Sequence, residues 1–120
     1  MNATSHLPPL ITAAQYLELI ANSIAALKGD KNLTPAVKLY TPDDCRTWLL
    51  TQISLDDANA AYGLIDLGDG SPTLDRIDLA ELTAFRGPKG SPVTQDTHFC
   101  ATQTIVEYLA EAFEFGTVMA

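Results

Sequence analysis

Basic side chains are scarce in this sequence. Seven Lys and Arg residues stand against fifteen Asp and Glu residues, so the formal net charge is −8. A protein with this charge repels the phosphates of nucleic acids and of anionic lipids. The composition therefore argues against direct nucleic-acid binding and against attachment to a membrane surface.

Long apolar runs and targeting signals are also lacking. No segment approaches the roughly 20 apolar residues that span a bilayer. The start "MNATSHLPPL" lacks the basic and apolar regions of a signal peptide. We therefore expect a cytoplasmic protein, in which the two cysteines, Cys45 and Cys100, are reduced thiols.

The residues that are present suit one globular domain. The chain has 120 residues, 47% of them hydrophobic and 18% charged, which is enough for one core and too short for two ordinary domains. We expect a single domain over residues 1–120, with residues 1–10 as a loose N-terminus. Trp48 is expected in the core, with four aromatic residues packed around it: Tyr40, Tyr62, Phe85 and Phe99.

An amphipathic helix is predicted after the first ten residues. Thr12 is a suitable N-cap with Gln15 three residues later, and Gly29 suits the helix end. Between them, four apolar residues recur at helical spacing and form a stripe that we expect to face the core: Leu17, Ile20, Ile24 and Leu27.

The rest of the chain reads as strands followed by helices. Asp78 is placed to cap a short helix, and a terminal helix is predicted from about Thr102 to Gly116. Before them lie three β-rich segments and a short fourth one, at 36–40, 47–53, 61–67 and 73–77. The order predicts an α+β fold, in which N-terminal and C-terminal helices cover one face of a small antiparallel sheet of three to four strands.

Carboxylates are concentrated between Asp56 and Glu81, where seven acidic residues are opposed by one base, Arg76. A calcium-binding loop does not fit this stretch. With Gly70 as the central glycine of an EF-hand, three ligand positions fall on residues that carry no oxygen donor: Ile65, Leu67 and Arg76. We expect neither a metal ion nor another cofactor.

No complete catalytic motif is present, because the sequence has neither a G-x-S-x-G nucleophile elbow nor a phosphate-binding loop. Asp66 interrupts an apolar run, so it is either on the solvent face or held by a partner. A Cys–His pair that uses His98 with Cys45 or Cys100 stays open. The prediction is a protein that is not an enzyme.

Several short motifs occur in order between Lys38 and Phe99. They are K-L-Y-T-P (38–42), T-W-L-L-T (47–51), Y-G-L-I-D-L-G (62–68), L-A-E-L (79–82), R-G (86–87) and D-T-H-F (96–99). Together they resemble an uncharacterised domain family found on bacterial plasmids, integrative conjugative elements and phages. The resemblance implies a mobile-element setting and supplies no established catalytic residues. This chain departs from the pattern at Ile65, where family members often have cysteine.

Two functions follow as hypotheses. The first is a small acidic interaction protein of a mobile element, which binds a protein with a basic nucleic-acid-binding surface and inhibits a defence system of the anti-CRISPR or anti-restriction type. Its candidate partner-binding residues are Asp56, Asp57, Asp66, Asp69 and Asp75. The alternative is an enzyme or small-ligand accessory domain with a site near Asp66, Asp96 and His98. Either protein is expected as a monomer or a homodimer.

Overall fold

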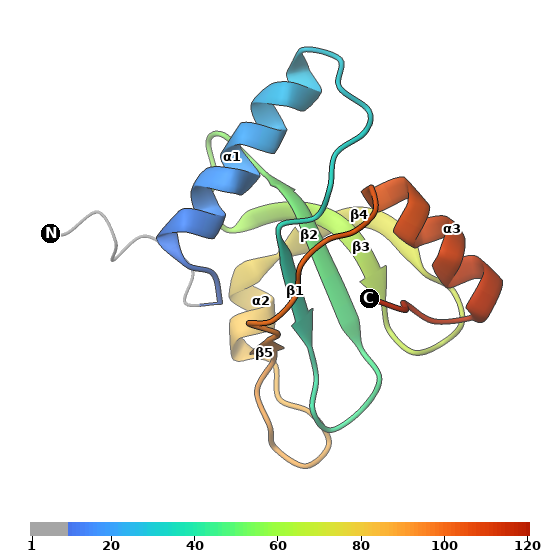
Figure 1. Ribbon diagram of the computed structural model, residues 1–120. Helices are drawn as coiled ribbons and strands as arrows, with labels where there is room; N and C mark the ends of the chain where they lie inside the picture. Colours follow the sequence, from blue (N-terminus) through green and yellow to red (C-terminus); the bar gives the residue numbers. More distant parts are fainter. Residues whose placement is uncertain (1–9) are drawn as a thin grey trace, which may run out of the picture.

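A five-stranded antiparallel sheet forms the centre of the fold, in the order β4-β3-β2-β1-β5 (Figure 1). This computed structural model describes residues 10–120. The predicted loose N-terminus therefore falls, except for Leu10, outside the described residues. In chain order the elements are α1 (Ala13–Leu27), β1 (Val37–Tyr40), β2 (Thr47–Ile53), β3 (Ala60–Asp66), β4 (Thr73–Asp78), α2 (Leu79–Ala84), β5 (Thr94–Gln95) and α3 (Ile105–Phe115).

The predicted α+β fold is confirmed, and the sheet has one strand more than expected. β5 contains two residues, which pair with Leu39 and Tyr40 of β1. A strand this short has no periodicity of its own, so the sequence pattern could not reveal it. Within residues 10–120, no helix is long and apolar enough to cross a membrane.

The helices cover both faces of the sheet, so the expectation that they cover one face is wrong. Neighbouring residues of a strand point to opposite faces. Leu50 of β2 belongs to a core that includes Leu19 of α1 and Leu79 of α2, whereas Leu49 belongs to a second core with Ile105 of α3. Figure 1 shows α1 and α2 on one side of the sheet and α3 on the other.

Local capping signals define the helix ends as predicted, with one addition. The hydroxyl of Thr12 accepts a hydrogen bond from the N–H of Gln15 at 3.1 Å, and the Gln15 side chain accepts one in return from Thr12. Gly116 ends α3 in the left-handed conformation. The additional signal is a second capping box, between Thr104 and Glu107, which starts α3 later than the predicted Thr102.

The first helix packs on the sheet through a different face from the predicted one. Leu19 and Ser23 are the buried residues of α1, whereas three members of the predicted stripe are exposed: Leu17, Ile24 and Leu27. The reason lies in the end of β2. Its pairing with β1 stops at Leu50, and its pairing with β3 is irregular between Leu50 and Gln52. Backbone groups of residues 51–53 are therefore left without a ladder partner, and a buried backbone group needs one.

Polar side chains of α1 supply those partners. The Ser23 hydroxyl donates to the carbonyl of Ile53 at 2.5 Å and accepts from the N–H of Ile53 at 3.0 Å. The Asn22 amide donates to the carbonyls of Thr51 at 2.9 Å and Thr34 at 3.0 Å. Because Asn22 and Ser23 face the end of β2, three of the four stripe residues of α1 are turned toward solvent, and only Ile20 packs on the core.

Candidate functional site

The structure places the five candidate aspartates in different environments. Asp66 is fully buried, and the other four are exposed: Asp56, Asp57, Asp69 and Asp75. The five residues therefore do not form one surface.

Asp66 holds the C-terminal segment against the sheet. Its Oδ1 accepts a hydrogen bond from the N–H of Gly68 at 2.9 Å. Its Oδ2 accepts one from the hydroxyl of Thr117 at 3.0 Å and another from the N–H of Val118 at 2.9 Å. A buried carboxylate with both oxygens engaged cannot contact a partner protein. The assignment of Asp66 to a partner-binding surface is therefore wrong.

Asp56 and Asp57 lie in the connection between β2 and β3. Asp56 accepts a hydrogen bond from the hydroxyl of Ser54 at 2.5 Å. Asp57 accepts one from the N–H of Asn59 at 2.9 Å, and its other oxygen lies 3.6 Å from the guanidinium of Arg76 on β4. Asp56, Asp57 and Arg76 therefore lie at the same end of the sheet.

Asp69 lies at the other end of the sheet, in the turn that joins β3 to β4. In Figure 1 this turn lies near the end of α3, away from the β2–β3 connection beside α1. The two turns are separated by the length of β3, roughly 20 Å for seven residues. Asp75 lies between them on the edge strand β4, where its Oδ1 accepts a hydrogen bond from the N–H of Arg76 at 2.7 Å.

A groove opens at the end of the sheet that carries Asp56 and Asp57. Its volume is about 370 Å³, and its lining includes Leu27, Ile53, Leu55, Ala61, Tyr62 and Arg76. Three of these apolar side chains are strongly exposed: Leu27 at 77%, Leu55 at 52% and Tyr62 at 40%. We call this feature the end groove. Its size is at the lower end of the range for ligand-binding sites.

Sequence reasoning missed the end groove because it placed two of its residues in the core. Leu27 was expected in the buried stripe of α1, and Tyr62 was expected to pack around Trp48. Tyr62 is opposite Gln52 in the β2–β3 pair, whereas Trp48 is opposite Ile65. Residues 62 and 65 point to opposite faces of β3, so Tyr62 cannot reach Trp48. The bulge at Thr51 shifts the pairing of β2 with β3, and no residue pattern in the sequence indicates a bulge there.

The alternative site near Asp66, Asp96 and His98 is not assembled by the hydrogen bonds and ion pairs of residues 10–120. Asp96 pairs with Lys38 at 3.5 Å and accepts a hydrogen bond from the N–H of His98 at 3.0 Å. His98 is exposed, Asp66 is engaged by the C-terminal segment, and none of the three lines the end groove.

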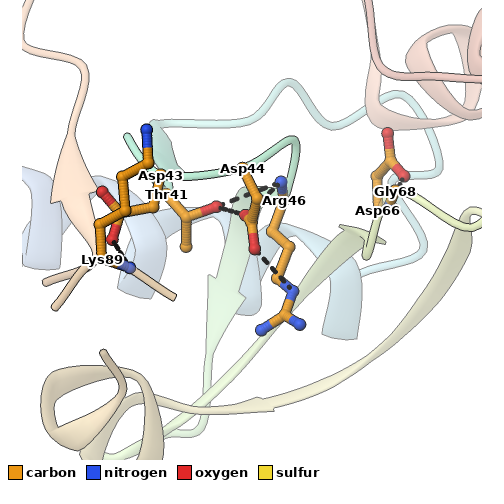
Figure 2. A network of polar contacts seen from close by, with 7 residues as sticks. All are labelled: Thr41, Asp43, Asp44, Arg46, Asp66, Gly68 and Lys89. Atoms are coloured by element: carbon orange, nitrogen blue, oxygen red, sulfur yellow. Dashed lines mark hydrogen bonds and ion pairs between the residues drawn. The ribbon is translucent and has the colours of Figure 1, made fainter. Parts of the chain in front are cut away.

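A polar network joins two loops at the end of the sheet opposite the end groove. Asp43, in the β1–β2 connection, accepts a hydrogen bond from the N–H of Lys89 at 2.9 Å (Figure 2). It accepts a second one from the N–H of Ser91 at 3.0 Å. A side chain at Gly87 would lie 2.6 Å from the Asp43 carboxylate, which explains the glycine there. Through its hydroxyl and its N–H, Ser91 holds the pKa of Asp43 below its ordinary value, and Lys89 adds to this effect.

The same connection contains a second bonded carboxylate. The hydroxyl of Thr41 donates to Asp44 and is the main cause of the lowered pKa of this carboxyl group (Figure 2). The guanidinium of Arg46 lies 3.5 Å from Asp44 and 4.8 Å from the centre of the Phe85 ring. Thr41 of the K-L-Y-T-P motif thus bonds to Asp44, and Gly87 of the R-G motif lies against Asp43, so both motifs contribute to contacts that stabilise loops.

The network predicts a response to acid. A carboxylate with a depressed pKa in the folded state stabilises that state above its unfolded pKa of about 3.9, and this contribution is lost as the pH falls through the folded pKa. We expect the amide signals of Lys89 and Ser91 to shift in an NMR titration with a midpoint below 3.9. Asp43→Asn should abolish that shift. A midpoint at or above 3.9 would contradict the assignment.

Within residues 10–120, no three His, Cys, Asp or Glu side chains come together as candidate metal ligands. Cys45 and Cys100 are free and exposed.

The structure thus defines a small α+β protein with an open groove at one end of its sheet and structural polar contacts at the other. Residues 10–119 match the family described as "Protein of unknown function (DUF2958)". The chain belongs to this family, which confirms the coarse form of the resemblance seen in the sequence. No curated protein and no solved structure matches the chain significantly.

Proposed function

We propose that this protein is a small acidic interaction protein of a bacterial mobile element. In this proposal it acts in the cytoplasm, binds a nucleic-acid-handling protein through that protein's basic surface, and inhibits a defence system such as CRISPR interference or restriction.

One observation carries the proposal: four exposed carboxylates are held in fixed orientations. In each of them, Oδ1 accepts a hydrogen bond from a nearby group at 2.5–3.0 Å: Ser54 for Asp56, Asn59 for Asp57, Ser71 for Asp69 and Arg76 for Asp75. Within the described residues, the only ion pair that they form is the one between Asp57 and Arg76.

Fixed negative charges suit a surface that replaces phosphates. A carboxylate that is already oriented loses little conformational freedom when it meets a Lys or Arg side chain. Complementary charge also increases the association rate and discriminates against wrong partners. The total charge of −8 supports the same class of partner.

Affinity capture tests this function. Tagged protein is incubated with lysate from bacteria that carry restriction and CRISPR systems, at low and high salt. The variant changes Asp56, Asp57, Asp69 and Asp75 to Asn, which keeps the Oδ1 acceptors, and Asp66 is left intact because it is structural. We expect wild type to retain a nucleic-acid-handling complex that the variant loses, and high salt to weaken the retention.

A second fourfold variant provides a control with the same net charge. It carries Glu18→Gln, Asp30→Asn, Glu111→Gln and Glu114→Gln, and it should retain the complex. Retention of the same proteins by wild type and the Asp variant, or loss with both variants, would contradict a role for these particular carboxylates. Inhibition is then measured as phage plating efficiency on a host with the captured system. Wild type should raise it and the Asp variant should not.

A further inference from the structure

We propose that the end groove binds a large apolar side chain of a basic segment in the partner protein, while Lys or Arg residues next to that side chain pair with Asp56 and Asp57. This inference rests on the proposed function, because it names the chemistry of the partner at the end of the sheet that carries two of the four exposed carboxylates, Asp56 and Asp57.

The first argument is the exposure of apolar side chains around one concave feature. Leu27, Leu55 and Tyr62 come from α1, the β2–β3 connection and β3, yet all three line the end groove. Single exposed apolar residues are common on protein surfaces, but a group that surrounds a cavity is typical of interaction sites. A groove of about 370 Å³ is within the size range of small-ligand sites, so a large apolar side chain fits into it.

The second argument is that polar groups on the inner wall of the groove already have hydrogen-bond partners. Ser23 and Ile53 both line it, and they are joined by the two hydrogen bonds between the Ser23 hydroxyl and the backbone of Ile53. An apolar side chain that enters therefore leaves these polar groups paired. Binding of an apolar group is favoured where it displaces water without stripping partners from buried polar atoms.

The third argument is the charge at the rim. Asp56 follows Leu55 directly and is bonded to Ser54, so its carboxylate lies beside two residues that line the groove. Asp57 is paired with Arg76, but this pair is open to solvent, with side chains 48% and 69% exposed. An exposed ion pair of this kind contributes little to stability, so an incoming cation can replace the existing one.

The same charges argue against a second copy of this chain as the occupant. A twofold interface brings the same surface of both copies together. At the end groove it would place Asp56 and Asp57 of one copy near those of the other, in a molecule of net charge −8. Complementarity therefore favours a basic partner.

Peptides of defined composition test this proposal. The probe is a synthetic peptide with one Trp flanked on each side by two Lys residues, added to ¹⁵N-labelled protein and followed by NMR. We expect it to shift the amide signals of residues 23–28, 52–57 and 60–62. A peptide with Ala for Trp, and one with Glu for Lys, should each bind at least about tenfold more weakly.

Variants of the groove give the matched comparison. Leu27→Ser with Leu55→Ser should weaken binding of the Trp peptide by about tenfold or more. Leu17→Ser is the control, because Leu17 is also on α1 and is 66% exposed but does not line the groove. It should leave binding unchanged. No shift at millimolar peptide, shifts centred on Asp69, or equal binding of all three peptides would overturn the proposal.

Two further measurements separate this inference from the proposed function. If the captured complex is lost with the Asp variant but retained by the Leu27 and Leu55 variant, the groove proposal fails. The proposed function as an acidic interaction protein then stands. Loss with both supports both. Sedimentation of the protein alone is the other measurement: a dimer that the groove variant dissociates would identify a second copy as occupant and overturn the proposal.

Discussion

Replacing Gly63 by alanine is expected to destabilise the fold by more than about 3 kcal/mol, because the new methyl group meets the backbone of the neighbouring strand. Gly63 is opposite Leu50 in the centre of the sheet. A Cβ atom there would lie 1.9 Å from the carbonyl oxygen of Leu49 and 2.9 Å from its carbonyl carbon. Neither atom can rotate away, so β2 and β3 must separate at a point where both are buried.

Chemical unfolding by urea measures this effect, with Gly70→Ala as the control. Gly70 lies in the turn after β3, has a φ of +78°, and has no atom within 4 Å of a Cβ built on it. Alanine at that position should cost about 1–2 kcal/mol, from the left-handed backbone alone. If the two variants unfold at the same urea concentration, the close approach at Gly63 does not constrain the sheet.

Asp66→Ala is expected to lower the free energy of unfolding by about 3 kcal/mol. The change removes one acceptor group and leaves three donors without a partner, from Gly68, Thr117 and Val118. Hydrogen bonds to a charged group contribute more than neutral ones, and unpaired buried donors add a desolvation penalty. The C-terminal segment should then detach, and Val118 should lose its contact with the core that contains Leu49 and Ile105.

Two measurements check the role of Asp66. Urea unfolding gives the stability, and hydrogen exchange at the amide of Val118 gives the local effect. Thr117→Val removes one donor of the three and should cost about 1 kcal/mol. A loss below 1 kcal/mol for Asp66→Ala, with Val118 still protected, would show that this carboxylate is not what holds the segment.

Features set by neighbouring residues could be predicted from the sequence. The Thr12 capping box, the strand at Thr47–Ile53 and the end of α3 at Gly116 depend on side chains within a few positions of one another. Propensity and capping act at that range, so the main helices and strands, and with them the α+β class, could be predicted from the sequence.

Features set by distant contacts could not be predicted. The face that α1 presents to the sheet depends on hydrogen bonds from Asn22 and Ser23 to Thr51 and Ile53 at the end of β2, about 30 positions later. The apolar stripe of α1 gave the wrong face because helical periodicity describes only the helix, not the backbone groups that its neighbour must satisfy. The exposure of Leu27, and with it the end groove, follows from that contact.

The candidate aspartates show the same division. Their acidity and their number are properties of the sequence, but their distribution depends on the fold. Strand β3 separates Asp57 from Asp69, so these two residues lie at opposite ends of the sheet. Asp66 is buried under the C-terminal segment, about 50 positions later. Charge alone therefore predicted the class of partner that we propose and could not define a single patch.

The link between Asp66 and the C-terminal segment also orders events during synthesis. The helices α1 and α2 and the strands β1 to β4 leave the ribosome before α3. The core that contains Leu19 and Leu79 can therefore pack first. Thr117 and Val118 follow Asp66 by 51 and 52 positions, a delay of roughly 3 to 10 s at ordinary translation rates. During that interval the nascent protein exposes Leu49 and Leu64 on an uncovered sheet face, which is the kind of surface that chaperones bind.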